Sequence, residues 1–187
     1  MKEQNRQRIV EILTESFKEN KSTNFVIKQD KKKDKRLKKL IEYSIFYGDS
    51  FGEVFLSEDK NACYIIIDTE KKKTTLRSIL WDLRLIFQCI GIKNVRKVMK
   101  REALIKANHP KESFIHLWYI GVIPIKQSLG IGTRLMKKII ESAQAQNRKI
   151  YLETSTERNF KFYEQLGFKE ELTLNQLGYS LKMYSLK

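Results

Sequence analysis

A buried β-strand, a short connection and an amphipathic helix follow one another without interruption between residues 114 and 145. The segment Phe114 to Ile123 is apolar almost throughout, with His116 as the exception, which is typical of a central strand covered on both faces. Pro124 is predicted to end the strand. From Ile131 to Ala145 the apolar residues recur on one side of a helix and the charged residues on the other. This unit requires a sheet on which helices pack.

The connection between this strand and helix is rich in glycine. It reads Gln127-Ser128-Leu129-Gly130-Ile131-Gly132-Thr133. Glycine lets the backbone approach a ligand closely, and the unpaired N–H groups and dipole at a helix N-terminus favour phosphate. The loop is therefore predicted to hold a pyrophosphate group, the alternative being that its glycines only shape an ordinary turn. It fits neither the Gly-Lys-Ser/Thr phosphate loop nor the dinucleotide fingerprint, which needs a glycine where Leu135 stands.

The loop and its surroundings resemble the signatures of one enzyme family. Gln127, Gly130 and Gly132 follow the pattern Gln/Arg-x-x-Gly-x-Gly/Ala between a strand and a helix, and the strand end Tyr119–Pro124 precedes them. Downstream, residues 151–168 include Leu-Glu-Thr-Ser and Arg-Asn-Phe-Lys-Phe-Tyr-Glu-Gln-Leu-Gly-Phe. In these features the sequence resembles the GNAT superfamily of acetyl-CoA-dependent N-acetyltransferases, and the downstream run resembles its puromycin acetyltransferase-like branch.

The resemblance implies an α+β fold, the GNAT fold, in which helices flank a mixed, largely antiparallel sheet. Two neighbouring parallel strands, here 114–123 and 149–154, would splay apart and open a notch for the pantetheine arm of acetyl-CoA. A single domain, 1–187, is expected. Its acetyl-CoA-binding core would be 114–187, where the resemblance is specific, and the helices and hairpin of 1–113 would shape the acceptor site.

The resemblance also implies which residues bind acetyl-CoA. The main chain of Ile120 and Val122 would pair with the pantetheine arm, and the N–H groups of the loop would bind pyrophosphate. Asn159 would reach CoA, or would only cap the helix that follows it. The extra phosphate of the nucleotide would meet basic side chains, which could equally be solvated. These are Lys126, Arg134, Lys137 and Lys138. The predicted cofactor-binding residues are Ile120, Val122, Gln127, Ser128, Leu129, Gly130, Ile131, Gly132, Thr133 and Asn159.

Three residues are candidates for catalysis. Tyr163 matches the family tyrosine that can protonate the leaving thiolate or donate a hydrogen bond to it, its alternative being a core aromatic residue. His116 suits a general base, because the imidazole group can change its charge near neutral pH, although a histidine in an apolar strand is commonly a packed one. Glu153 would bind the acceptor amine or relay its proton, and otherwise would form a salt bridge; a water chain could replace both bases. The implied reaction is direct transfer in a ternary complex, with acetyl-CoA as cosubstrate, no metal and no cysteine nucleophile.

Before residue 114 the pattern of apolar residues predicts helices and one hairpin. Thr74 or Thr75 is predicted to cap a helix that Gly91 ends. The other predicted elements are helices through 9–17 and 37–45, a short strand at 24–28, a hairpin formed by 51–56 and 63–67, and a helix from about Lys93 to before His109.

The chain of 187 residues has 37 Lys and Arg against 22 Asp and Glu, a formal net charge of +15. This excess favours polyanionic partners in general. The basic run 31–39 includes a leucine of a helical stripe, so its lysines are assigned to a solvated helix face and no specific nucleic-acid partner is expected. Two cysteines, no secretory signal and no long apolar run indicate a cytoplasmic protein without a membrane partner.

The sequence thus predicts an N-acetyltransferase that acts on a primary amine, preferably of a small molecule. The alternatives are acetylation of a protein N-terminus or lysine, a basic nucleic-acid-binding protein, and a domain that binds CoA without catalysis. Trp81, Trp118 and the segment 179–186 suit a dimer interface as well as a core, so both a monomer and a homodimer are compatible with the sequence.

Overall fold

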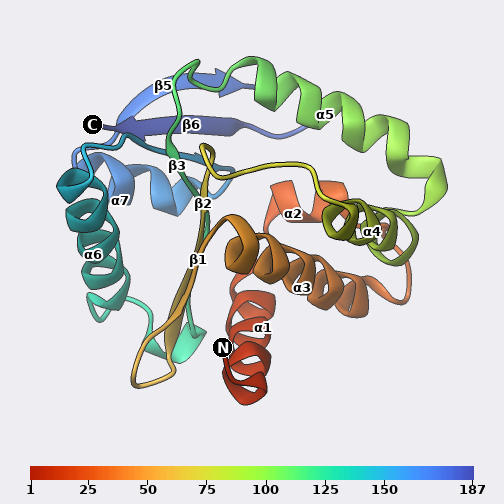
Figure 1. The fold of residues 1–187 in the computed structure, drawn as a ribbon, viewed down its shortest axis with the longest axis horizontal. Coiled ribbons are helices and arrows are strands. Elements are labelled where there is room, and N and C mark those ends of the chain that lie inside the picture. Colours follow the sequence, from red (N-terminus) through yellow and green to blue (C-terminus); the bar gives the residue numbers. More distant parts are fainter.

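A six-stranded mixed sheet organises the computed structural model, which describes residues 1–187 (Figure 1). The strand order is β1-β2-β3-β4-β6-β5, and every neighbouring pair is antiparallel except β3 and β4, as the predicted α+β fold requires. The strands are β1 (Gly52–Leu56), β2 (Ala62–Asp68), β3 (Ile115–Val122), β4 (Ile150–Thr154), β5 (Lys169–Leu174) and β6 (Leu181–Leu186).

The parallel pair separates soon after it begins. β3 and β4 are paired only at Ile115 with Ile150 and at His116 with Tyr151. Beyond these positions β3 stays paired with β2, and β4 stays paired with β6, so the two strands diverge within one continuous sheet. The predicted notch between splayed parallel strands is confirmed.

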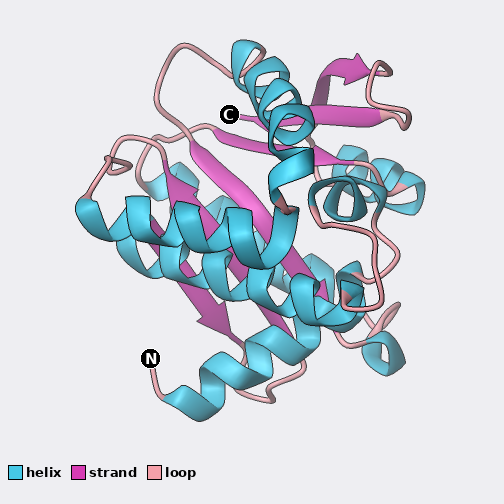
Figure 2. Cartoon of the chain, turned by 90° about the vertical axis from the view of Figure 1, so that its right-hand side faces the viewer, coloured by secondary structure: helices cyan, strands magenta, loops and turns pink.

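Helices cover both faces of the sheet. In Figure 1, α6 (Ile131–Ala145) and α7 (Phe160–Gln165) lie on one side, and the helices of the N-terminal half lie on the other. Figure 2 shows the second group in front of the strands. That group is α1 (Glu3–Phe17), α2 (Lys21–Val26), α3 (Lys33–Phe51), α4 (Leu76–Leu85) and α5 (Val95–Ala107).

Each face has its own apolar core. On one face Leu135, Met136 and Ile139 of α6 pack with the strands and with Tyr163 of α7. On the other face the buried residues of α1 and α3 pack against β2 and β3. The helical spacing of the apolar residues in the sequence therefore located these packing faces correctly.

The predicted strand at 24–28 is wrong. Residues 21–26 form the short helix α2, because the side chain of Asn20 accepts a hydrogen bond from the backbone N–H of Thr23 and caps it. Only Ile27, directly after the helix, is extended, and its side chain is buried in the core beside α1 and α3. The β-branched pair Val26-Ile27 suggested a strand, but the local cap decided the conformation.

The helices predicted through 9–17 and 37–45 are longer in the structure, Glu3–Phe17 and Lys33–Phe51, so Phe51 belongs to a helix and not to the predicted hairpin strand. The other predicted bounds are confirmed within two residues. Thr75 caps α4 through a reciprocal pair of hydrogen bonds with Ser78. α4 passes into a π-helical turn, Ile86–Ile90, which ends at Gly91 with φ of 76°. No helix is both long and apolar enough to cross a membrane.

Candidate active site

A single cavity of about 1340 Å³ runs through the notch between β3 and β4. Its lining includes the glycine-rich loop, Tyr163 of α7 and the end of β4, together with residues of α2, α3, α4 and α5. The C-terminal residues singled out in the sequence and the N-terminal helices therefore face one space.

β3 contains a bulge in the part of the strand that borders this space. Ile65 is opposite Tyr119 and Ile66 is opposite Leu117, so Trp118 is the extra residue of β3. His116 and Trp118, before and at the bulge, line the cavity from β3, as do Ile120 and Val122 after it. All residues of β3 from His116 to Val122 line the cavity, and every second one is half-buried although the strand is central.

The glycine-rich loop presents unpaired N–H groups to the cavity. From Ser128 to Thr133 no backbone N–H donates a hydrogen bond within the protein, and the first bond of α6 is donated by Arg134. Ser128 and Gly130 have φ of 63° and 72°, the left-handed conformation that turns the chain into the helix. The side chain of Gln127 donates to the carbonyl of Val122 at 3.0 Å and holds the loop against the end of β3.

Most, but not all, of the predicted cofactor-binding residues line the cavity. Leu129 is 60% exposed and does not line it, and the side chain of Ile131 packs into the core, so these two face the cavity at most with their backbone. Asn159 precedes α7 but makes no capping hydrogen bond with its side chain. The lining members are Ile120, Val122, Gln127, Ser128, Gly130, Gly132, Thr133 and Asn159.

Of the four basic residues near the loop, only Lys126 lines the cavity. The ammonium group of Lys138 lies 3.6 Å from the centroid of the Phe55 ring, a cation–π contact on the surface of α6. Arg134 and Lys137 are exposed. For Arg134, Lys137 and Lys138, a position in solvent therefore fits better than a contact with phosphate.

Tyr163 is buried with its side chain against Phe162, Phe168 and Tyr184, and it lines the cavity. Its hydroxyl group has no hydrogen-bond partner in the protein, although its atoms are not sealed from the cavity. Burial raises the pKa of this phenol well above its ordinary value. The group is therefore a protonated donor at neutral pH, and a partner in the cavity would satisfy it.

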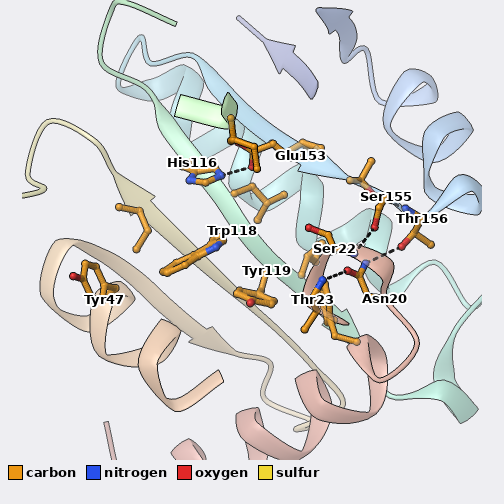
Figure 3. A pocket seen from close by; sticks show the side chains of 18 of the residues that line it. Asn20, Ser22, Thr23, Tyr47, His116, Trp118, Tyr119, Glu153, Ser155 and Thr156 are labelled. Atoms are coloured by element: carbon orange, nitrogen blue, oxygen red, sulfur yellow. Dashed lines mark hydrogen bonds and ion pairs between the residues drawn. The ribbon is translucent and has the colours of Figure 1, made fainter. Parts of the chain in front are cut away.

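Glu153 binds two histidines. Oε1 lies 2.6 Å from Nε2 of His109, and Oε2 lies 2.7 Å from Nε2 of His116 (Figure 3 shows the second contact). Burial by itself would raise the pKa of Glu153, but the two imidazoles outweigh that effect and hold the pKa well below its usual range. An ionised carboxylate only accepts hydrogen bonds, so each ring donates from Nε2.

The two predicted base candidates are thus one hydrogen-bonded cluster, and His109 completes it. Sequence reasoning missed His109, because it lies after α5 and reaches Glu153 only in the folded chain. The dipeptide His109-Pro110 was interpreted only as the end of a helix. No group of three or more His, Cys, Asp and Glu side chains is arranged to hold a metal ion.

The two cysteines lie in the interior. Burial raises the pKa of both thiols, that of Cys89 to about 12. A thiolate is the nucleophilic form of cysteine, so neither residue is suited to covalent catalysis near neutral pH.

The sheet with one splayed parallel pair, flanked by helices and followed by a glycine-rich helix N-terminus, is the fold of the GNAT acyltransferases. Residues 88–168 match the Acetyltransferase (GNAT) family model. This match identifies a GNAT acetyltransferase domain within the chain, which is an acyltransferase enzyme.

Solved structures with the same fold are similar over almost the whole chain. One is histone acetyltransferase HPA2 and related acetyltransferase from Corynebacterium glutamicum ATCC 13032, with 16% identity, a TM-score of 0.67, and coverage of 99% of this chain and 92% of that one. The C-terminal condensation domain of Ebony in complex with beta-alanyl-dopamine is 9% identical, with a TM-score of 0.68 and coverage of 100% and 95%. An N-acetyltransferase from Staphylococcus aureus Mu50 is 15% identical, with a TM-score of 0.61 and coverage of 98% and 96%.

Proposed function

We propose that this protein transfers the acetyl group of acetyl-CoA directly to the primary amine of a small molecule. One observation carries the proposal: the loop of unpaired N–H groups, the buried phenol of Tyr163 and the His109–Glu153–His116 cluster all line the same cavity. Acetyl-CoA and the acceptor amine could therefore meet in this cavity. Holding two reactants in the right geometry can supply a large part of an enzyme's rate enhancement.

The loop fits the pyrophosphate of acetyl-CoA. Unpaired N–H groups from Ser128 to Thr133 and the positive end of the α6 dipole would bind its negative charge. The main chain of Ile120 and Val122 would bind the pantetheine arm where β3 and β4 diverge. Asn159, which makes no cap, would add a side-chain contact.

The histidine–glutamate cluster would remove the proton from the acceptor amine. Nδ1 of His116 has no partner in the protein, so it is free to accept a proton while Nε2–H is held by Glu153. The carboxylate fixes the tautomer and stabilises the imidazolium that forms, as an aspartate does for the histidine of a catalytic triad. His109 binds the other oxygen and keeps the carboxylate in place, which makes it a positioning residue.

Tyr163 would act at the leaving group. Because its pKa is raised, the phenol keeps its proton and would donate a hydrogen bond to the sulfur as negative charge develops there. The amine nitrogen would form the new bond to the carbonyl carbon, the carbon–sulfur bond would break, and the proton that His116 takes from the amine would balance the charge of the leaving thiolate.

The approach to the notch favours a small acceptor. α2 stands across the segment that follows β4, where Asn20 binds Thr156 at 3.1 Å and the backbone N–H of Ser22 binds Ser155 at 3.2 Å (Figure 3). These contacts narrow the entrance for a folded protein. The solved structures with this fold include both a histone acetyltransferase and a domain that holds beta-alanyl-dopamine, so the fold itself selects neither acceptor class.

The test is an assay of CoA release with acetyl-CoA and a panel of primary amines, peptides with free N-termini and lysine-containing peptides, with the products identified by mass spectrometry. We expect acetylated small amines. His116→Gln and Glu153→Gln should lower kcat by about a hundredfold with little change in the acetyl-CoA KM. The control is Glu141→Gln, an exposed carboxylate on α6 outside the cavity, which should match the wild type.

Two results would overturn the proposal in different ways. Acetylation of the peptides alone would replace the small acceptor with a protein. Wild-type turnover in both cluster variants would remove the His116–Glu153 pair from the mechanism.

A further inference from the structure

One part of the cavity is walled by aromatic side chains. Tyr43 and Tyr47 line it from α3, and Trp118 lines it from β3. The centroid of the Trp118 ring lies 6.1 Å from that of Tyr43 and 6.2 Å from that of Tyr47. The His116 ring is stacked on the other side of Trp118 at 6.5 Å, and Figure 3 shows Trp118 between His116 and Tyr47.

The carboxylate of Asp82, on α4, lies at the end of this aromatic wall. The hydroxyl groups of Tyr43 and Tyr47 both donate to its Oδ1, at 2.7 and 2.8 Å. Burial and the neighbouring carboxylate raise the pKa of both phenols, so they remain donors. The two bonds hold Asp82 in place on one oxygen, while Oδ2 has no hydrogen-bond partner.

Asp82 differs from the other carboxylates of the cavity in having no cationic partner. Glu102 pairs with Arg101, Glu112 pairs with Lys149, and Glu153 binds two histidines. No ammonium or guanidinium group lies within 4.0 Å of Asp82, although the residue lines the cavity. A partly buried carboxylate without a counter-ion is costly unless a ligand supplies the charge.

Lys72, which approaches the Tyr47 ring, does not act as the counter-ion of Asp82. Nζ of Lys72 lies 5.8 Å from the centroid of the Tyr47 ring and forms no ion pair with Asp82. Lys72 and its neighbour Lys73 are exposed on the loop that leads to α4. Their side chains can stay in solvent while a smaller cation occupies the space beside the carboxylate.

We propose that Tyr43, Tyr47, Asp82 and Trp118 form a subsite for a second cationic group of the acceptor. The acceptor class would be an amine with another ammonium or guanidinium group joined to the reacting amine by an extended apolar chain. The second cation would bind the free oxygen of Asp82 and the aromatic faces, and the chain would lie along Trp118 towards His116. The inference rests on the proposed function, because it places the reacting amine beside His116.

The test compares n-alkylamines with α,ω-diaminoalkanes of the same chain length, from three to eight carbons, by kcat/KM at saturating acetyl-CoA. We expect the best diamine to exceed its matched monoamine by about tenfold. Asp82→Asn should abolish this preference by raising the KM for the diamine, while kcat/KM for the monoamine stays unchanged. The amide keeps an acceptor for the two phenols and removes only the charge.

The control for charge loss is Asp34→Asn, on the exposed face of α3 and outside the cavity, which should keep the diamine preference. Thermal unfolding of each variant reports whether it is folded. Equal kcat/KM values of the wild type for diamines and monoamines would overturn the subsite. A preference for diamines that persists in folded Asp82→Asn would overturn it as well. If the wild type acetylated no amine of either series, the proposed function itself would have failed.

Discussion

Tyr163 is a buried aromatic residue for which we propose a role in catalysis in addition to packing. Its ring has the aromatic neighbours of a core residue, but its hydroxyl group has no partner in the protein and faces the cavity. A phenol that only packed would be expected to find a partner for its hydroxyl group. The structure therefore shows that the ring packs in the core, and its role at the leaving group is our proposal.

Replacing Tyr163 by Phe should separate the two roles. Because no protein hydrogen bond is lost, we expect the melting temperature to stay near that of the wild type, while kcat falls by about a hundredfold. The measurement is steady-state kinetics beside thermal unfolding. Tyr184→Phe removes a phenol that donates to Glu164 outside the cavity, and should leave kcat unchanged. A destabilised Tyr163→Phe protein with normal kcat would assign the residue to packing.

Asp68 provides a pH-dependent contribution to stability. Arg148 donates to its Oδ1 at 2.7 Å, and the backbone N–H of Glu70 donates to the same oxygen. Burial by itself would raise the pKa of Asp68, but the guanidinium and the N–H hold it below its usual value. A carboxylate with a lowered folded-state pKa stabilises the fold above its unfolded-state pKa of about 3.9, and this contribution is lost as the pH falls through the folded-state value.

We therefore predict that Asp68→Asn lowers the free energy of unfolding at pH 7, and that the difference from the wild type shrinks as the pH falls below about 4. Urea unfolding at a series of pH values measures it. Asp34→Asn, at an exposed ion pair with Lys18, should show a much smaller difference at every pH. A difference between Asp68→Asn and the wild type that did not depend on pH would contradict the assignment.

At the scale of elements, α4 depends on its cap. The hydroxyl group of Thr75 accepts from the backbone N–H of Ser78 at 3.0 Å, and the Ser78 hydroxyl accepts from the backbone N–H of Thr75 at 2.9 Å. Thr75→Ala should destabilise the protein by about 1 kcal/mol, measured by chemical unfolding. The neighbouring Thr74 is exposed and makes no such bond, so an equal effect of Thr74→Ala would show that the cap is not the cause.

Local signals made the C-terminal elements predictable. The helix predicted at 131–145 has those bounds in the structure, because its apolar stripe and its glycine-rich start are both local features. The strand predicted at 24–28 failed, because a six-residue helix is too short for a periodic pattern and depends on the single cap of Asn20. A helix is thus predictable from its apolar period only when it is long enough to show that period, which α6 is and α2 is not.

At the scale of the whole molecule, the parts of the site that the sequence did not predict are those assembled from distant segments. His116 and Glu153 lie within the recognisable signatures, but His109 joins them only when the end of α5 folds back over β4. Asp82 meets Tyr43 and Tyr47 only because α4 packs against α3. The spacing of these residues along the sequence does not predict such contacts.

We propose that residues 1–187 fold as one cooperative unit. β2, from the N-terminal half, pairs with β3 along its whole length, so one sheet includes strands of both halves. Unfolding followed by the fluorescence of Trp81 and Trp118 and by far-ultraviolet circular dichroism should therefore give coincident single transitions. Separate midpoints for the two signals would indicate two independently folding parts.

The central claim is that the loop at the start of α6 binds acetyl-CoA. Gly132 suits a test because a Cβ there would meet only Phe162 and Val122, at ordinary distances of 3.8 and 3.9 Å, so a substitution fills the cavity entrance without a backbone clash. Gly132→Glu would place a carboxylate among the unpaired N–H groups. Ile125→Glu adds the same charge at a side chain that is 83% exposed and outside the cavity.

The measurement is a calorimetric titration of the three proteins with acetyl-CoA. We predict saturable binding by the wild type and by Ile125→Glu, and loss of that binding in folded Gly132→Glu. A folded wild type that took up no acetyl-CoA, or a Gly132→Glu protein that bound it as tightly as the wild type, would contradict the assignment of the loop.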